Sequence, residues 1–158
     1  MHAKTFEIVP FDRKYSAEVV GFWRESKERA LGQPEKHSFE NHIEFLENHL
    51  SPEYKVLVAV DPTNYGAVGM IAYNSEEVGQ LYIHPNFQGM GIGTQLLNIA
   101  KEGSNGSLWL FTFEINVGAQ KFYERHGFKV IGRGYENEET LPDIKYKWVR
   151  SESKISND

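Results

Sequence analysis

The stretch that decides the fold runs from residue 81 to residue 94 and reads Leu81-Tyr82-Ile83-His84-Pro85-Asn86-Phe87-Gln88-Gly89-Met90-Gly91-Ile92-Gly93-Thr94. Its apolar start predicts the end of a strand, and the segment beginning at Thr94 predicts a helix. The loop between them carries three alternating glycines. Such a loop can aim free backbone N–H groups at an anion, and the helix N-terminus adds a partial positive charge. The stretch therefore predicts a phosphate-binding site.

Two common phosphate-binding motifs do not fit this loop. The dinucleotide fingerprint G-x-G-x-x-G would need its third glycine where Thr94 stands. The nucleotide P-loop needs a Gly-Lys pair, and no lysine lies between Lys55 and Lys101. A tight structural turn is the alternative, but alternating glycines are costly unless something approaches the backbone closely.

Length and composition narrow the class of protein. The chain has 158 residues, which fits a single domain over residues 1–150 followed by a polar tail, 151–158. Its formal net charge of −5 disfavours a nucleic-acid partner. The absence of cysteine excludes disulfides, thiolate metal sites and a cysteine nucleophile. Short apolar runs and an N-terminus without a signal-peptide core predict a cytoplasmic protein that does not enter a membrane.

Hydrophobic periodicity and turn residues place the other elements. An N-terminal strand leads into a helix that ends near Gly32, and Ser38 caps a second helix whose stripe is Phe39, Ile43, Leu46 and Leu50. The histidines of that second helix, His42 and His49, are expected to face solvent. The remaining elements are expected as strands at 55–60, 67–73, 78–83, 108–113, 128–132 and 144–149, and as helices at 94–102 and 116–125.

At these residues the chain resembles the GNAT superfamily of acetyl-CoA-dependent N-acetyltransferases. The family's Gln-x-x-Gly-x-Gly signature is present as Gln88, Gly91 and Gly93. A second block, from Asn116 to Phe128, is similar to the family's downstream Asn, Ala, Phe-Tyr and Gly-Phe pattern. The resemblance implies an α+β fold, in which a central, mostly antiparallel mixed sheet with a splayed cofactor strand is flanked by helices.

The resemblance also implies how acetyl-CoA, the cosubstrate, would bind. The pantetheine arm would lie along the splayed strand at Leu81 and Ile83. The pyrophosphate would sit on the loop of the signature, and the Thr94 hydroxyl would either cap the helix or donate to a phosphate. The spacing of Asn116, Ala119 and Tyr123 puts them on one helical face, which should meet the cofactor. The implied cofactor-binding residues are Leu81, Ile83, Gln88, Gly89, Met90, Gly91, Ile92, Gly93, Thr94, Asn116 and Ala119.

Catalysis needs an acid and a base. The resemblance makes Tyr123 the general acid that protonates the departing thiolate, with a packing role as the alternative and with Phe122 expected to supply the core contact. An amine acceptor must lose a proton, so a base or a water chain is expected. Glu77 occupies the place where histone-acetylating branches of the family carry their base, and an exposed turn residue is the alternative reading. Glu114, at the end of the next strand, is a weaker candidate, and His84 is expected to be a solvent-facing residue at the entry to the loop. No metal is expected.

The acceptor is expected to be a primary amine, on a small molecule or on a protein, that attacks the thioester directly in a ternary complex. In this family the acceptor site lies near residues 32–38 and 136–143. Glu136, Glu138, Glu139 and Asp143 form an acidic cluster there that could attract a cationic amine, or could be a solvated turn. A non-catalytic acyl-CoA sensor or interaction module is the alternative function, and the sequence leaves a homodimer open.

Overall fold

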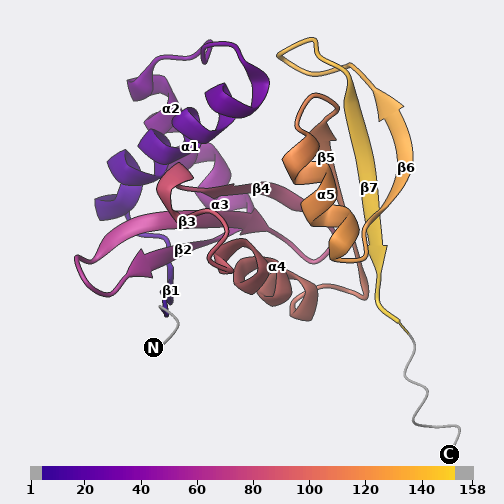
Figure 1. Ribbon diagram of the computed structural model, residues 1–158. Coiled ribbons are helices and arrows are strands. Elements are labelled where there is room, and N and C mark those ends of the chain that lie inside the picture. The colour runs from indigo at the N-terminus through magenta and orange to yellow at the C-terminus, as the bar shows by residue number, and fades with distance from the viewer. Residues whose placement is uncertain (1–4, 152–158) are drawn as a thin grey trace, which may run out of the picture.

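The computed structural model describes residues 5–151, so residues 1–4 and most of the predicted tail lie outside the described part. Seven strands and the helices between them follow in the expected order (Figure 1). The strands are β1 (Glu7–Pro10), β2 (Lys55–Asp61), β3 (Gly66–Tyr73), β4 (Val78–Ile83), β5 (Ser107–Phe113), β6 (Lys129–Gly134) and β7 (Asp143–Val149). The helices are α1 (Ser16–Leu31), α2 (Phe39–Phe45), α3 (Ser51–Glu53), α4 (Ile92–Glu102) and α5 (Val117–Arg125).

The strands form two antiparallel sheets that are joined by a single isolated β-bridge. Their orders are β1-β2-β3-β4 and β5-β7-β6, so β4 and β5 are the facing edges. An isolated parallel bridge joins Glu77 to Trp109, and the Trp109 N–H donates to the Glu76 carbonyl at 3.0 Å. Beyond this bridge the two strands have no further pairing. The predicted α+β class and the splayed cofactor strand are therefore confirmed.

Two apolar cores hold helices on opposite faces of the first sheet. One core packs α4 and α5 against the sheets through residues such as Ile71, Leu96 and Leu108. The other packs α1 and the second helical segment through Val20, Leu46 and Met70. Because α1 and α4 lie on different faces, each approaches the free edge of β4 from its own side (Figure 1).

The second helical segment corrects one prediction. It begins at the predicted cap, since Ser38 accepts a hydrogen bond from the Asn41 N–H, and it continues through a π-helical turn at Leu46–Leu50 into α3. His42, expected in solvent, is only 7% exposed, whereas Phe39 is exposed. The reason is Trp23 of α1, whose ring stands edge-on to His42 with centroids 4.4 Å apart. Burial lowers the pKa of His42 to about 4, so its ring is neutral at physiological pH.

Within residues 5–151, no helix combines the length and the apolar composition needed to span a bilayer.

Candidate functional site

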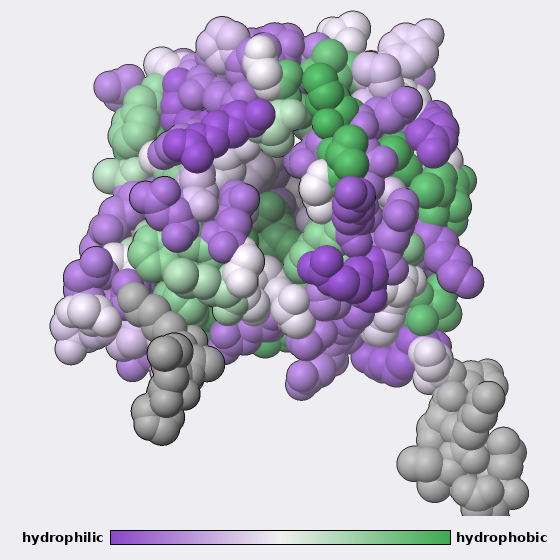
Figure 2. Space-filling model, in the orientation of Figure 1, coloured by the Kyte–Doolittle hydropathy of each residue, from purple (hydrophilic) through white to green (hydrophobic). Residues whose placement is uncertain are grey.

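A cavity of about 640 Å³ opens where β4 and β5 separate. Figure 2 shows this face of the molecule hollowed between its two halves, with apolar side chains inside the hollow. The size suits a cofactor or other small ligand. Its walls come from the C-terminal half of α1, the end of β4, the glycine loop, the first turn of α4, the end of β5 and the inner face of α5.

The free edge of β4 presents main-chain groups to this cavity. The His84 N–H donates to the Val68 carbonyl on β3 at 2.8 Å. Antiparallel pairing alternates along a strand, so Tyr82 also bonds toward β3, and the main-chain groups of Leu81 and Ile83 point to the open edge. An extended chain lying in the cavity could therefore pair with β4 as an extra strand does.

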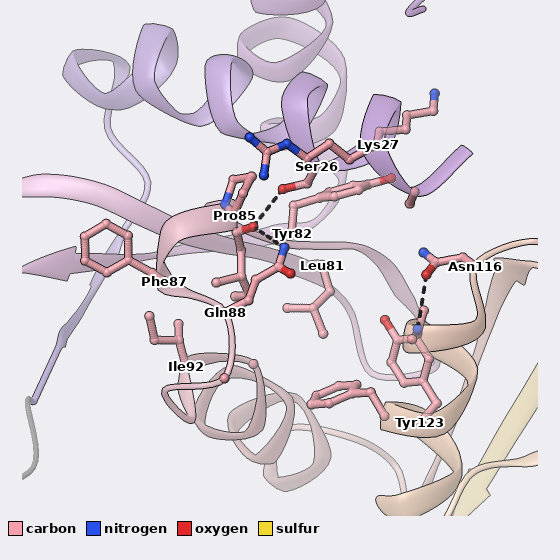
Figure 3. Close-up of a pocket in the computed structure, with 18 of the residues that line it drawn as sticks. Ser26, Lys27, Leu81, Tyr82, Pro85, Phe87, Gln88, Ile92, Asn116 and Tyr123 are labelled. Carbon is pink, nitrogen blue, oxygen red and sulfur yellow. Dashed lines mark hydrogen bonds between the residues drawn. The ribbon is translucent and has the colours of Figure 1, made fainter. Parts of the chain in front are cut away.

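One of those edge groups already has partners. The Ile83 carbonyl accepts hydrogen bonds from the Ser26 hydroxyl at 2.7 Å and from the Gln88 side-chain amide at 3.1 Å (Figure 3). Gln88, expected to bind the cofactor, thus ties the start of the glycine loop to the end of β4. The Ser26 bond fixes α1 to the same point, which leaves the Leu81 groups and the Ile83 N–H facing the cavity.

The glycines of the loop serve different purposes. Gly89 and Gly91 have φ angles of +81° and +86°, a left-handed conformation that other residues adopt at a cost. Gly93 lies inside α4, where an added Cβ would come within 3.2 Å of the Phe122 ring. The first two glycines shape the turn, and the third lets α5 approach α4.

The first turn of α4 has main-chain N–H donors and no side-chain cap. Gly91 precedes the helix without any side-chain cap, and the first intrahelical bond runs from the Gln95 N–H to the Gly91 carbonyl. The N–H groups of Ile92, Gly93 and Thr94 therefore lack intrahelical partners. No acidic residue lies in this turn. Thr94 is not the cap, which corrects one of its two expected roles.

Side chains of the loop differ from expectation in two places. Met90 is 51% exposed and does not line the cavity. The Ile92 side chain is buried in the core beside α4 and can offer a ligand only its main chain. The remaining predicted cofactor residues, Leu81, Ile83, Gln88, Gly89, Gly91, Gly93, Thr94, Asn116 and Ala119, all line the cavity.

The charges around the cavity are positive although the chain is acidic overall. The charged residues that line it are Lys27, Arg29 and Arg125, and no carboxylate does so among the described residues. Arg29 pairs with Glu25 on its own helix at 2.6 Å. Lys27 is paired with carboxylates as well, so Arg125 is the lining cation that best suits a ligand that carries phosphates.

The helix α5 brings its predicted face to the cavity. Asn116 caps the helix by accepting a hydrogen bond from the Ala119 N–H at 3.1 Å, so its side-chain NH₂ group can serve as a donor (Figure 3). Ala119 and Tyr123 follow along the same wall.

Tyr123 is 8% exposed and belongs to the core, while its neighbour Phe122 is only partly buried. Phe122 packs against the core as expected, but Tyr123 is itself a core residue, so the contact of Phe122 does not free Tyr123 from packing. The Tyr123 ring packs edge-on against Phe128, with centroids 5.5 Å apart. Burial raises the pKa of Tyr123 well above its usual range, because the phenolate would lose its hydration. The phenol is thus fully protonated at neutral pH and lies in the wall of the cavity.

The candidate bases lie outside the cavity lining. Glu77 stands at the β4–β5 bridge and accepts a hydrogen bond from the Tyr54 hydroxyl at 2.8 Å. Glu114 is an exposed residue whose carboxylate lies 3.6 Å from Arg133. His84 uses Nδ1 to accept the Asn86 N–H.

Two loops meet at the far end of the cavity, at the top of Figure 1. Lys27 Nζ lies 2.8 Å from Glu139 of the β6–β7 loop and 3.3 Å from Glu35 of the α1–α2 loop. His37 contacts the Glu138 carboxylate at 2.7 Å. We call Lys27, Glu35 and Glu139 the loop clasp. Their side chains are 18%, 3% and 9% exposed, so the clasp is largely buried.

Most carboxylates of the predicted acidic cluster have a partner in the structure. Glu138 and Glu139 have cationic or imidazole partners, and the Asp143 carboxylate is buried and accepts a hydrogen bond from the Asn137 amide. The cluster therefore does not act as one free acidic surface.

Sequence reasoning missed Ser26, Lys27, Tyr82 and Arg125 as parts of the cavity wall. Tyr82 could have been predicted, because strand alternation points its side chain to the face of the sheet opposite to the side chains of Leu81 and Ile83. On that face its ring stacks on Trp23, with centroids 5.2 Å apart. Nothing in the sequence marks the others.

Comparison with known proteins agrees with this geometry. A family model described as an acetyltransferase (GNAT) domain matches residues 52–130. The peptidyl-lysine N-acetyltransferase YjaB of Salmonella typhimurium is 31% identical over 115 residues, which are 73% of this chain and 77% of that protein.

Solved structures show the same fold. The apo-form of YjaB from Escherichia coli superposes with a TM-score of 0.75 at 24% identity, over 93% of this chain and 99% of that one. The PaiA N-acetyltransferase of Thermoplasma acidophilum, in complex with coenzyme A, gives a TM-score of 0.68 at 19% identity, over 92% and 99%.

Proposed function

The chain belongs to the GNAT family and is an acyltransferase, and from that premise we propose that it transfers the acetyl group of acetyl-CoA to a primary amine. The observation that carries this proposal is the meeting, in one cavity, of a free strand edge on β4 with the unpartnered N–H groups of α4. The first fits the amide-containing pantetheine arm, and the second fits its pyrophosphate.

The residues of the cavity supply the rest of the cofactor site. The Leu81 main chain and the Asn116 amide bind the pantetheine, and the turn Ile92–Thr94 binds the pyrophosphate. Arg125, at the end of α5, adds a positive charge on the same wall. This arrangement leads the thioester toward Tyr123, which lines the cavity from α5.

The chemistry is a direct transfer. The amine nitrogen attacks the thioester carbonyl carbon, the C–S bond breaks, and the Tyr123 hydroxyl gives its proton to the departing sulfur. Tyr123 then recovers a proton from solvent. Burial that raises the pKa of the phenol also raises that of a thiol beside it, because neither anion is hydrated there. The phenol therefore keeps its proton until the sulfur departs.

The attacking ammonium must also lose a proton. Because no carboxylate among the described residues lines the cavity, we propose that water carries this proton out and that Glu77 receives it at the β4–β5 bridge. Tyr54, the residue that follows α3, donates a hydrogen bond that holds the Glu77 carboxylate in place.

We propose an amine on a flexible alkyl chain, such as a lysine side chain, as the acceptor. The relative from S. typhimurium is named as a peptidyl-lysine N-acetyltransferase. Lys27 of the loop clasp lines the cavity and ties α1 to the loop between β6 and β7, and a slender alkyl chain needs less room beside it than a bulky amine does.

Release of free CoA with a panel of acceptors tests this function. The panel should pair a lysine-containing peptide with its arginine counterpart and should include small polyamines and amino acids. We expect acetyl-CoA turnover above buffer with the lysine peptide and none with the arginine peptide. If acetyl-CoA binds but no acceptor releases CoA, the protein is a cofactor-binding module instead.

A further inference from the structure

A hydrogen bond joins the first turn of α4 to the end of α5. The Thr94 side-chain oxygen lies 3.0 Å from His126 Nε2. Thr94 is one of the three residues whose N–H groups face the cavity, and His126 directly follows the last residue of α5. His126 does not itself line the cavity, so it acts on that space only through Thr94.

Contacts on several sides hold His126 in this position. Its ring packs against Phe122, with centroids 4.6 Å apart, and Phe122 in turn contacts Gly93. Its carbonyl accepts a hydrogen bond from Lys101 Nζ at 2.7 Å. The imidazole is therefore fixed relative to the α4 N-terminus.

The charge state of His126 is set by its surroundings. Burial lowers the pKa of His126, and the nearby cations Lys101 on α4 and Arg125 on α5 lower it further. The ring is thus neutral at physiological pH in the free protein. A neutral ring has one N–H. When that N–H is on Nε2 it donates to the Thr94 oxygen, which leaves the Thr94 hydroxyl hydrogen free to point into the cavity.

We propose that His126 is a positioning residue for the cofactor phosphates. His126 turns the Thr94 hydroxyl into a donor for the pyrophosphate, and it takes up a proton when the pyrophosphate binds. This inference rests on the proposed function. The contact between Thr94 and His126 supports the inference. This contact couples a titratable ring to the only side-chain hydroxyl in the proposed anion-binding turn of α4.

The charges near His126 determine the direction in which pyrophosphate binding changes its pKa. A bound pyrophosphate offsets the effect of Lys101 and Arg125, so the pKa of His126 is higher in the complex than in the free protein. The complex then binds more protons than its components do, and affinity increases as the pH falls. The gain reaches about tenfold for each unit by which the pKa rises.

Calorimetric titration of the full chain between pH 6 and pH 8.5 tests this proposal. Dephospho-CoA is the main probe, because CoA carries a phosphomonoester that itself titrates near pH 6. We expect dephospho-CoA to bind more tightly at pH 6 than at pH 8, with proton uptake visible as a dependence of the heat on the buffer. CoA reports whether the site binds the cofactor at all.

Substitutions of His126 distinguish a role in positioning Thr94 from a role in packing alone. His126→Gln retains a side-chain donor, so it should keep the affinity at pH 8 within a few-fold and lose both the proton uptake and the pH dependence. His126→Phe should bind less tightly at every pH, and His49→Gln, an exposed histidine on another helix, should behave as the wild type.

Proton uptake that persists in His126→Gln, or its absence from the wild type, overturns the proposal. If the wild type binds neither CoA nor dephospho-CoA, the proposed function has failed instead. Melting curves of all variants show whether they fold.

Discussion

At the scale of single residues, Tyr123 has two roles that are usually separate. It is a core residue that contacts Phe128, and it lines the cavity where the thioester would lie. A buried phenol can act as a proton donor without cost to the core, because its ring does the packing and only its oxygen does the chemistry.

Tyr123→Phe keeps the ring and removes the proton. We expect turnover to fall by about 100-fold to 10,000-fold, the usual worth of general acid catalysis. Acetyl-CoA affinity and melting temperature should change little. Steady-state kinetics and calorimetry measure these quantities. Tyr146→Phe is the matched control, because Tyr146 is also buried but bonds to Glu124 and does not line the cavity. Full activity in Tyr123→Phe would assign the proton to water.

The role of Glu77 is tested in the pH profile. Glu77→Gln keeps the contact with Tyr54 but cannot accept a proton, so kcat/KM should fall most at neutral pH and recover toward higher pH, where free amine is abundant. Glu114→Gln is the control, since that exposed residue contacts Arg133 on the surface. An unchanged profile for Glu77→Gln would leave solvent as the base.

At the scale of elements, the junction of β4, the glycine loop and α4 forms the proposed anion site. The strand ends where Gln88 and Ser26 both bond to Ile83, two left-handed glycines turn the chain, and the helix begins without a cap. The backbone of this junction supplies the donors, so its shape matters more than its side chains.

Gly91→Val tests this junction. The residue has a φ of +86° with nothing within 4 Å of an added Cβ, so the cost comes from the backbone. That cost is roughly 1–2 kcal/mol, and it should weaken acetyl-CoA binding by tenfold or more. Gly106→Val, with a φ of +108° and equally open surroundings, is the control. It should lose similar stability and keep its affinity for the cofactor.

At the scale of the whole molecule, the loop clasp joins parts that are far apart in the chain. Lys27 and Glu139 are 112 residues apart, and their contact joins α1 to the β6–β7 loop. Burial by itself would lower the pKa of Lys27, but Glu139 and Glu35 outweigh it and raise that pKa. Burial would raise the pKa of Glu35, but Lys27 outweighs it and lowers that pKa.

Lys27→Met should leave two buried carboxylates without their cation and destabilise the protein by about 3 kcal/mol. The clasp should contribute fully between about pH 5 and pH 10, because its stabilisation is lost only as Glu35 protonates in acid or Lys27 deprotonates in base. Urea unfolding over this range measures both effects. Arg29→Met, which removes the exposed pair with Glu25, should cost at most about 1 kcal/mol. Equal losses for the two variants would contradict a buried clasp.

Local signals in the sequence were sufficient for the element order and for most residues of the cavity wall where we propose that the cofactor binds. Glycine spacing, strand alternation and the i, i+3, i+7 face of α5 depend only on neighbours along the chain, so the loop, β4 and Asn116, Ala119 and Tyr123 could be predicted.

Only the tertiary structure decided which side chains from distant elements meet. The pairing of Thr94 with His126, the burial of His42 against Trp23, the closure of Lys27 on Glu139, and the absence of Glu77 from the cavity wall all depend on how helices pack on the two sheets. Such contacts leave no periodic pattern, because each is a single meeting of residues separated by a long stretch of chain.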